Sequence, residues 1–395
     1  MVFGITSIVG PNNKHYIDPL WFQDLKQHAS YINNLTLCCP CRHGEIPENW
    51  IAIEDDKQAK DIRIIPLQDA RSFIQSLMKL PVNLATLWRA IKAVDIVHAS
   101  IADWPLPFGW FVYPIARLRK KLSVLVVESA FWRVGGRISL KLRIKETVWE
   151  TINRWCVGLA DFTIFTHEQY RTSLSKNQRG HIIPASWIKN SDIMLHRDCI
   201  ENWTKLLENP SPLRLLFAGR LIVDKGILVL LNAAEQLKRC NAQITIDIIG
   251  SGNLLSACRS VSEKLQNNIK VNVLEPCPYG KPFFNLLRNY HAVVVPNISD
   301  DQPRILYDAF SQGIPIIGTN ADGISYTVKH DQTGIIIEKN DVEALSEAIQ
   351  QIAKKPASLR DLGLNALEKA RENTHEHMHD KRRQLLLTKI NEFWK

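Results

Sequence analysis

The sequence predicts an α/β protein built from two doubly wound domains in tandem. Two observations predict this class. Short apolar runs alternate with longer segments of helical periodicity along most of the 395 residues, which is the pattern of parallel strands joined by crossover helices. A polar stretch near the middle interrupts this pattern, which then restarts. The length suits two domains of ordinary size, each with its own core.

The first half contains seven apolar runs that we expect to be strands. They are residues 2–9, 35–39, 62–67, 95–98, 123–127, 162–165 and 181–183. Helical periodicity favours helices at 19–31, 84–93 and 139–157. These elements make a first domain over residues 1–190.

The second half begins after a polar, irregular stretch that we interpret as a linker over residues 191–212. This stretch ends in Asn209-Pro-Ser-Pro212, a turn signal. Strands are then expected at 213–218, 244–249, 271–274, 292–295, 315–318 and 334–337, and helices at 226–239, 304–312 and 342–354. Residues 213–373 form the second domain, and 374–395 read as a basic amphipathic helix.

Composition is that of a globular protein, with 45% hydrophobic and 23% charged residues. The formal net charge is +9, and the excess is concentrated between Asp103 and Arg154, where ten Lys and Arg face four Asp and Glu. A basic excess favours an anionic partner. Two interpretations stay open here: a solvated helix face, or a patch that touches anionic lipid or a charged acceptor.

Cysteine usage and the lack of targeting segments favour a cytosolic protein, either free or peripheral at the inner face of a membrane. Cys38, Cys39 and Cys41 cluster without a second pair at zinc-site spacing, and we interpret them as reduced thiols. Residues 1–11 lack the charged start of a signal peptide. The apolar stretch 104–116 is too short to span a bilayer and is broken by three prolines.

The strongest local motif is a short loop that combines glycines with two cations. A predicted strand ends at Gly219, Arg220 and Lys225 follow, and a helix begins near Gly226. Free N–H groups at a helix N-terminus bind anions, and the two cations add to that preference, so a diphosphate site is plausible. The alternative is a strand–helix turn with two exposed cations.

A second motif places two carboxylates around the start of a predicted helix. Asp300 lies in the loop after a strand, and Asp308 follows eight residues later on the first turns of the helix. Carboxylates suit sugar and ribose hydroxyls because each accepts several hydrogen bonds. The alternative, helix capping by Asp300 or Asp301, does not exclude sugar binding.

Taken in order, five motifs across roughly residues 213–354 resemble one family. They are Gly219-Arg220 with Asp224-Lys225-Gly226, the pair Asp300 and Asp308, Gly313-Ile314-Pro315, the turn 321–324, and the short strand after Gly334. This half is similar to the donor domain of retaining GT-B glycosyltransferases of the family 4, or group 1, type. The resemblance implies two Rossmann-like domains facing a central cleft, and a final helix that packs back on the first domain.

The resemblance also implies roles for individual residues. Arg220 and Lys225 would neutralise the donor diphosphate, Asp308 would hold the nucleotide ribose, and Asp300 would orient hydroxyls of the transferred sugar. The remaining donor-binding residues would be Gly219, Asp301, Gln302, Pro303, Arg304 and Gly323. The implied activity is transfer of a sugar from a nucleotide-sugar to a hydroxyl acceptor with retention, in polysaccharide or glycoconjugate synthesis. No metal and no cofactor is expected, because Arg and Lys replace a divalent ion.

The sequence departs from the family pattern at several positions. Both acids are Asp where the family usually has Glu, and Asp301-Gln302-Pro303 stands where a Gly-Phe-Gly run is common, which leaves donor identity open. In the first half, Glu128 and His98 are the candidates for the family's His.

Three other histidine or aspartate positions in the first half are weaker candidates. His15, Asp18 and His167 also fall near predicted strand ends. The expected partners are a nucleotide-sugar and a glycan, lipid-linked or other hydroxyl acceptor, with contact to anionic membrane and none to nucleic acid, since no aromatic platform accompanies the cations.

Three alternatives remain beside this hypothesis. Gly250-Ser-Gly252 follows a strand but lacks the third glycine of a dinucleotide fingerprint, so we interpret it as a tight turn. His375 and His379 satisfy a zinc-protease spacing, yet they lie after a complete α/β domain. The third alternative is a catalytically inactive nucleotide- or sugar-binding protein on the same scaffold.

Overall fold

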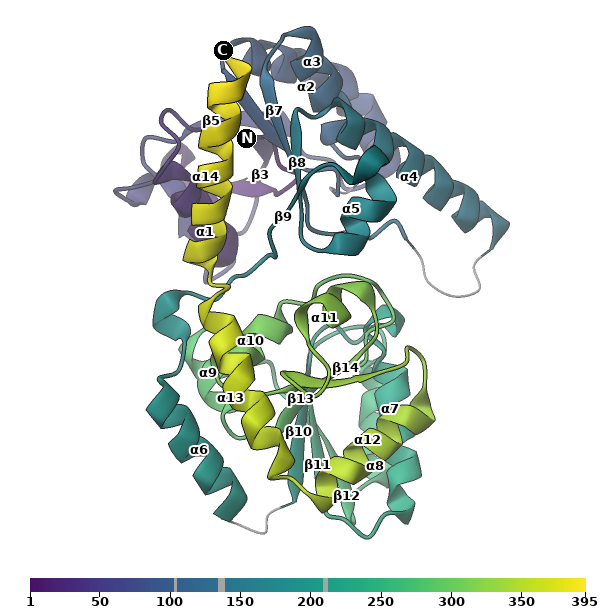
Figure 1. The fold of residues 1–395 in the computed structure, drawn as a ribbon. Coiled ribbons are helices and arrows are strands. Elements are labelled where there is room, and N and C mark those ends of the chain that lie inside the picture. The colour runs from purple at the N-terminus through teal and green to yellow at the C-terminus, as the bar shows by residue number, and fades with distance from the viewer. Residues whose placement is uncertain (103–104, 134–138, 209–211) are drawn as a thin grey trace. The chain divides into compact units, whose positions relative to one another are not determined.

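The computed structural model describes residues 1–102, 105–133, 139–208 and 212–395. The chain divides into two compact units. Unit 1 comprises Met1–Trp132, Ser139–Pro184 and Met378–Lys395, and unit 2 comprises Ala185–His377 with the segment 133–138, of which only Arg133 is described. Each unit has its own sheet and its own core, and each is described by itself (Figure 1).

Unit 2 is built on a parallel sheet of six strands. In chain order these are β10 (Leu213–Ala218), β11 (Ile244–Ile249), β12 (Ile269–Leu274), β13 (Ala292–Val295), β14 (Ile316–Thr319) and β15 (Gly334–Ile337). Their order in the sheet is β12-β11-β10-β13-β14-β15, and every pairing is parallel. This is the strand order of a doubly wound fold, in which ligands bind beyond the carboxyl ends of the strands where the order reverses, here between β10 and β13.

Helices cover both faces of this sheet. They are α6 (His196–Glu208), α7 (Ile227–Gln236), α8 (Leu255–Lys264), α9 (Lys281–Leu287), α10 (Ile305–Ser311), α11 (Asp322–Thr327), α12 (Val342–Lys354) and α13 (Ser358–Arg371). In Figure 1 the strands lie between α9, α10 and α13 on one side and α7, α8 and α12 on the other. The strands are apolar on both faces because each face is buried in a separate hydrophobic cluster.

Unit 1 has a mixed sheet. Its strands are β1 (Ser7–Val9), β2 (His15–Ile17), β3 (Thr36–His43), β4 (Ile51–Ala52), β5 (Arg63–Gln68), β6 (Ile96–Ala99), β7 (Leu122–Val127), β8 (Phe162–Phe165) and β9 (His181–Ile182). They run in the orders β4-β2-β1-β3-β5 and β6-β7-β8-β9, and single bridges from Val2 to Cys38 and to Ala99 join the two sets. Among the described strands, β2 runs antiparallel to both of its neighbours, β1 and β4, and the other pairings are parallel.

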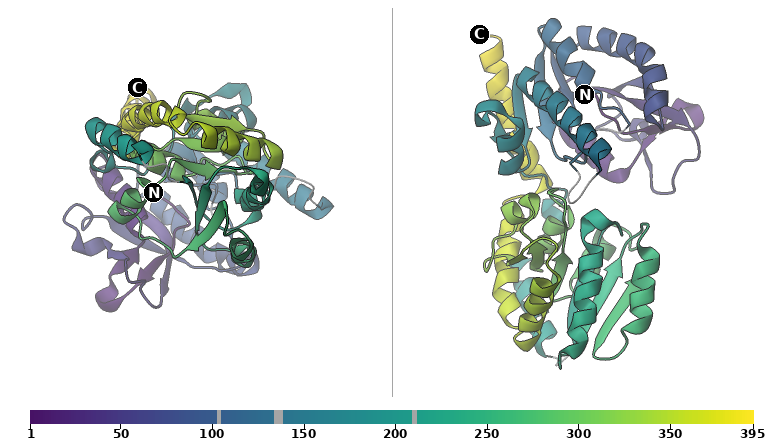
Figure 2. Two further views of the ribbon diagram at one scale, coloured as in Figure 1. Left: turned by 90° about the horizontal axis from the view of Figure 1, so that it is seen from below. Right: turned by 90° about the vertical axis from the view of Figure 1, so that its right-hand side faces the viewer.

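The helices of unit 1 include one that comes from the far end of the sequence. The others are α1 (Pro19–Ala29), α2 (Phe73–Lys92), α3 (Gly109–Leu118), α4 (Leu140–Leu159) and α5 (Glu168–Leu174). Helix α14 (His375–Phe393) lies beside unit 1 in Figure 2. Its Met378 is buried with β7, β8 and Ile183, and Leu385 and Ile390 pack against the same cluster.

Several expected elements differ from the structure. Of the predicted strand 2–9, only Ser7–Val9 forms a strand, β1. Strands β2 and β4 were not predicted. The predicted helix 84–93 is the second half of α2, which starts at Phe73 because Ser72 caps it and which passes through the exposed Pro81. The apolar stretch 104–116 overlaps α3, and of its residues 104 lies outside the described part of the chain.

The expected irregular linker over residues 191–212 is wrong for most of its length. It contains α6, whose Cys199 and Trp203, four positions apart, are fully buried in the core of unit 2. The Trp203 indole N–H donates to Gly313 O at 3.0 Å. Most residues of this helix are polar, so its narrow apolar stripe was not recognised in the sequence. Residues 209–211 of the predicted turn lie outside the described part.

Candidate functional site

The candidate site is formed by loops at the carboxyl ends of the strands of unit 2. The loop after β10 carries Gly219, Arg220 and Lys225, with one 3-10 turn at Val223–Lys225 before α7 begins. Arg220 is exposed, whereas only 15% of the Lys225 side chain is exposed. Burial lowers the pKa of Lys225, the nearby Arg220 lowers it further, and Asp301 opposes both. Two cations therefore lie close together beside the point where the strand order reverses.

Gly226 lets this loop approach the neighbouring one. Its φ is +68°, and a Cβ at this position would lie 1.7 Å from Pro296 O, just after β13. Only glycine tolerates both the conformation and the contact. The approach brings Asp224 O within reach of the backbone N–H groups of Ile298 and Ser299, at 2.9 and 3.3 Å. The cation-bearing loop and the loop after β13 are thus fastened to each other through their backbones.

The loop after β13 carries the acidic residues and contacts two further loops. The Lys225 ammonium lies 3.9 Å from the carboxylate of Asp301. Asp300 accepts a hydrogen bond on its backbone O from Gly323 N at 3.1 Å, in the first turn of α11, which follows β14. Its carboxylate accepts from Lys339 Nζ at 2.9 Å, in the loop after β15. The side chains of Asp300 and Lys339 are about one third exposed, so both remain accessible to a ligand.

Asp308 is more deeply buried than the other acid. It lies in the first turn of α10 with 2% of its surface exposed. Tyr279 Oη donates a 2.9 Å hydrogen bond to its carboxylate, and Arg304 Nε lies 3.8 Å away. Burial raises the pKa of Asp308 to about 7, although Arg304 and the Tyr279 hydrogen bond act in the opposite direction. The guanidinium of Arg304 stacks on the Tyr279 ring, 4.5 Å from its centroid.

Gln302 links the loop after β13 to the start of unit 2. Its side-chain amide donates to Thr327 Oγ1 at 3.0 Å, and its Oε1 accepts from the Ala185 N–H at 3.2 Å. Gln302 therefore has a structural role in this loop, which the sequence did not reveal. Pro303 and Arg304 follow directly and lead into α10.

Two residues of this edge were missed from the sequence. Tyr279 follows β12 by five residues, and Lys339 follows β15 by two. Both strands were predicted, so a search for polar side chains after every strand end would have found them. Neither belongs to a recognised motif, which is why the resemblance did not point to them.

The candidates of unit 1 lie in a different environment. Glu128 directly follows β7 and accepts a 2.8 Å hydrogen bond from Arg382 of α14, a guanidinium that is only 6% exposed. His98 lies in β6 with its ring 5.2 Å from that of Phe3, and burial lowers its pKa well below the usual value. Its Nε2 is buried and has no hydrogen-bond partner within the described residues.

The weaker candidates of unit 1 have structural surroundings. His15 Nδ1 lies 2.7 Å from the Glu54 carboxylate, and Asp18 caps α1 through the Leu20 N–H. His167 is buried, with its ring centroid 3.8 Å from that of Tyr170. We assign no site role to these three residues.

The motifs that the sequence left as alternatives make the following contacts. A Cβ on Gly250 would lie 1.8 Å from Gly219 O, so this glycine permits the close approach of the loops after β11 and β10. His379 Nε2 contacts Asp24 at 3.0 Å and its Nδ1 contacts Tyr31 Oη at 3.1 Å. The backbone N–H of His375 donates to Ile188 O at 2.7 Å.

Among the described helices, none has the length and hydropathy to cross a membrane.

One family model matches the part of the chain that contains this candidate site. Residues 200–369 match the family model described as Glycosyl transferases group 1, a segment that includes every candidate residue of unit 2. The matched segment is less than half of the chain. The match supports the resemblance seen in the sequence, at the level of the group.

Two curated relatives each align with about two fifths of the chain. The "D-inositol 3-phosphate glycosyltransferase" of Pseudarthrobacter chlorophenolicus is 28% identical over 168 residues, which is 41% of this chain and 39% of that protein. The "Capsular polysaccharide biosynthesis glycosyltransferase CapM" of Staphylococcus aureus is 26% identical over 153 residues, 38% of this chain and 39% of that protein. The chain thus aligns with about two fifths of the length of each of these relatives.

Solved structures match over nearly the whole chain. Sucrose-phosphate synthase from Thermosynechococcus elongatus superposes with a TM-score of 0.72 at 16% identity, covering 99% of this chain and 100% of that one. Anabaena Alr3699/HepE in complex with UDP and glucose superposes with a TM-score of 0.66 at 14% identity, covering 98% of both chains. These neighbours are GT-B glycosyltransferases, and the fold of this chain is GT-B, as the resemblance predicted.

Proposed function

We propose that this protein transfers a sugar from a nucleoside diphosphate sugar to an acceptor hydroxyl, using the carboxyl edge of unit 2 to bind the donor. The match to the glycosyl transferases group 1 model is the premise. The observation that carries the proposal is the arrangement of charges at this edge. Two cations, Arg220 and Lys225, lie on the loop after β10, and two carboxylates follow β13: Asp300 on the loop and Asp308 in the first turn of α10. The two loops are fastened to each other through Gly226 and Asp224.

The charges can be matched to the parts of such a donor. Arg220 and Lys225 offer positive charge to a diphosphate, and they stabilise it most as it departs and gains charge, so their effect is larger in the transition state than in the ground state. Asp308 accepts hydrogen bonds from the ribose and Asp300 from the sugar. Because the two cations supply the charge that a divalent ion would supply, we propose transfer without a metal.

The stereochemical outcome and the donor base are finer parts of the proposal. We propose retention of the anomeric configuration, which the resemblance to family 4 implies. Proton NMR tests retention, because the signal of the anomeric proton shows whether the sugar has the same configuration in the donor and in the product. One structural neighbour was solved with UDP and glucose, so uridine diphosphate is the first nucleotide to try.

Thermal unfolding with a panel of nucleotides tests the donor site. A ligand at 100 times its Kd stabilises a protein by about 2.7 kcal/mol, enough to shift the midpoint measurably. We expect one nucleoside diphosphate to stabilise the wild type without added metal and to lose this effect in the Arg220→Ala/Lys225→Ala double variant.

The matched control removes two cations elsewhere in unit 2. Lys238→Ala/Arg239→Ala changes the net charge equally, and both residues are exposed after α7. If a nucleotide still stabilises the Arg220→Ala/Lys225→Ala variant, the proposed site is contradicted. Stabilisation by a nucleotide-sugar with no turnover on any acceptor would favour the inactive binding protein.

We further propose that the acceptor is a lipid-linked glycan, a polysaccharide or a related glycoconjugate, and that unit 1 contacts anionic membrane. Arg117 in the last turn of α3 and Lys120 just after it are exposed, Lys121 is half-buried, and the first turns of α4 expose both lysine and apolar side chains. Cosedimentation with vesicles tests the membrane contact. Binding that does not change with the fraction of anionic lipid would contradict it.

A further inference from the structure

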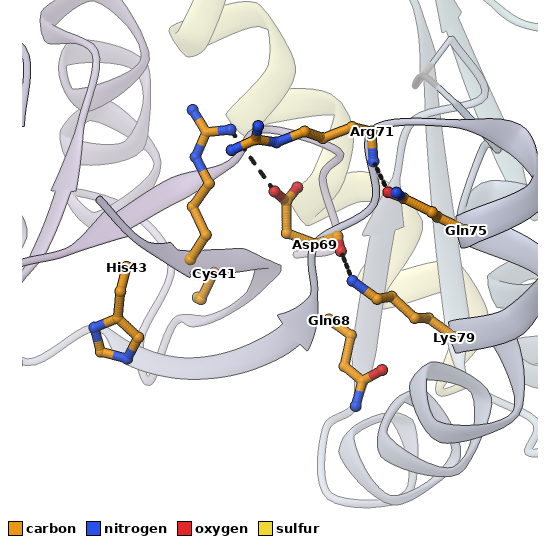
Figure 3. A pocket seen from close by; sticks show the side chains of 8 residues that line it. Cys41, His43, Gln68, Asp69, Arg71, Gln75 and Lys79 are labelled. Carbon is orange, nitrogen blue, oxygen red and sulfur yellow. Dashed lines mark hydrogen bonds and ion pairs between the residues drawn. The ribbon is translucent and has the colours of Figure 1, made fainter. Parts of the chain in front are cut away.

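Unit 1 contains a cavity that no sequence motif indicated. It measures about 600 Å³ and lies where β3 and β5 end. Its lining comes from the end of β3, from the end of β5 with the turn after it, and from the first turns of α2 (Figure 3). The lining residues are Cys41, Arg42, His43, Gln68, Asp69, Arg71, Gln75 and Lys79. A cavity of this size suits a small ligand.

The charges of this cavity are unbalanced. Arg42, Arg71 and Lys79 are positive, Asp69 is negative, and His43 adds a further polar side chain. Asp69 is held from two sides, since Thr6 Oγ1 donates to it at 3.1 Å and Arg42 lies 3.8 Å from its other oxygen. Its carboxylate therefore neutralises only part of the positive charge. The net charge is +1 while Cys41 is a thiolate, and +2 once that thiol is protonated, which a bound phosphate favours.

The backbone of the cavity adds to this preference. Ser72 caps the 20-residue helix α2, whose positive N-terminal end lies at the cavity, with Gln75 and Lys79 on its first two turns. The Lys79 ammonium donates to Asp69 O, and the Arg71 N–H donates to the Gln75 side chain at 3.0 Å. Asn83 exchanges two hydrogen bonds with the backbone of Gln68. The end of β5 is thus held in place while the cations remain partly exposed.

We propose that this cavity binds a phosphate group carried by the acceptor. A phosphate ester carries up to two negative charges and several acceptor oxygens, which match a net charge of +2 and two guanidinium groups. A carboxylate would neutralise only one of those charges. The cavity lies at the carboxyl edge of the parallel strands of unit 1, the edge at which doubly wound sheets bind ligands. That the ligand is an acceptor rests on the proposed function; the preference for phosphate does not.

Cys41 supplies a reporter for this site. It lines the cavity, and its Sγ lies 3.0 Å from Ser7 Oγ and 4.0 Å from Cys39 Sγ. Hydrogen bonds from Cys39 and Ser7 lower the pKa of the Cys41 thiol. Because alkylating agents react with the thiolate, Cys41 is the cysteine of this cluster that should react fastest. A bound phosphate would cover this thiol and raise its pKa, and both effects slow alkylation.

The experiment measures the rate of Cys41 alkylation by iodoacetamide, resolved by peptide mass spectrometry. The probes are inorganic phosphate, glucose 6-phosphate, glucuronate and vesicles with or without phosphatidic acid. All are tested in the Arg220→Ala/Lys225→Ala background, so that phosphate bound at the donor site cannot contribute. We expect glucose 6-phosphate or phosphatidic acid to slow Cys41 alkylation about tenfold at saturation, and glucuronate to have little effect.

The two arms distinguish the source of the phosphate. Protection by glucose 6-phosphate indicates a soluble phosphorylated acceptor. Protection by phosphatidic acid vesicles indicates a lipid phosphate, an arm included because Ile74 and Met78 of α2 are 71% and 77% exposed. Either result supports the cavity as a phosphate site.

Variants decide whether protection comes from this cavity. Arg42→Gln/Arg71→Gln should abolish protection, whereas Lys92→Gln, which removes an exposed cation at the other end of α2, should keep it. Equal protection in the double arginine variant, equal protection by glucuronate, or no protection by any phosphate probe would overturn the inference. The readout needs no sugar transfer, so it stands even if the proposed activity fails.

Discussion

The carboxyl edges of the two sheets are built in different ways. In unit 2 the edge is compact: loops after four different strands bond to one another, Asp308 is buried, and Gly226 admits no side chain. In unit 1 the edge holds an open cavity lined by partly exposed cations. A compact edge suits a ligand of constant chemistry, such as a nucleoside diphosphate. An open one suits a partner that differs among related proteins.

The largest expected effect comes from Gly226→Ala, which should break the compact edge. A Cβ at φ +68° that would lie 1.7 Å from Pro296 O forces the two loops apart. We expect a loss of at least about 3 kcal/mol in the free energy of unfolding, or a complete loss of nucleotide binding if the loops separate instead. Chemical denaturation and the nucleotide panel measure the two.

Gly158→Ala is the matched control for that variant. Gly158 lies in α4, and a Cβ there would meet no atom within 4 Å. It should leave nucleotide binding unchanged and increase stability by about 0.5–1 kcal/mol, because alanine favours helix. A neutral Gly226→Ala variant would show that the edge of unit 2 is not compact.

Glu128→Ala in unit 1 should have the next largest effect. It leaves the Arg382 guanidinium, 6% exposed, without its carboxylate partner. Glu128 itself is 35% exposed, but leaving a buried guanidinium without its partner costs about 3 kcal/mol. A loss of activity in this variant would therefore not by itself show a catalytic role. The comparison with Glu128→Gln, which keeps a hydrogen-bond acceptor for Arg382, separates the two. If Glu128→Gln is stable and inactive, Glu128 acts in the reaction.

The pH dependence of stability in Asp308→Asn tests whether the Asp308 carboxyl is buried at the compact edge of unit 2. Because burial raises the folded-state pKa of Asp308 to about 7, its contribution to stability is fully present below its unfolded pKa of about 4 and is lost as pH rises through 7. Asparagine is uncharged throughout. The stability of Asp308→Asn relative to wild type should therefore increase by about 2 kcal/mol between pH 5.5 and 8.5. A difference that is constant with pH, measured by denaturation at each pH, would contradict the assignment.

Lys339→Gln should have the smallest effect on stability, but it should change the binding of one class of ligand. The Lys339–Asp300 pair is about one third exposed, and such pairs contribute up to about 1 kcal/mol. If Asp300 orients the transferred sugar, the variant should weaken binding of a nucleotide-sugar more than binding of the matching nucleoside diphosphate. Calorimetry on both ligands gives the ratio. An unchanged ratio would remove Lys339 and Asp300 from the sugar part of the site.

The fold could be predicted from the sequence where strands are buried on both faces. The run 162–165 corresponds to β8 and the run 213–218 to β10, because strands buried on both sides read as continuous apolar runs. The short strands β2 and β4 contain only three and two residues, too few to show the alternation of buried and exposed residues that marks a strand. Helix α6 was missed because two side chains, Cys199 and Trp203, carry its buried face.

The sequence predicted site residues only where they belong to a motif with a fixed spacing. Arg220, Lys225, Asp300 and Asp308 fall in ordered motifs, and the fold places them in the segments that follow the carboxyl ends of β10 and β13. Tyr279 and Lys339 contact those acids from loops that are distant in sequence. The cavity beside Cys41 joins three segments of unit 1. Long-range proximity of this kind needs the folded chain.

The return of α14 to unit 1 has a consequence for how the protein is made. Met378, Leu385 and Ile390 complete a cluster with β7 and β8, yet the ribosome adds them only after all of Ala185–His377. Unit 2 is almost continuous in sequence and can fold during synthesis, whereas unit 1 must wait with part of its apolar surface uncovered. A fragment that ends at Pro184 would keep that surface exposed. Supplying residues 378–395 as a separate peptide is therefore expected to rescue its solubility.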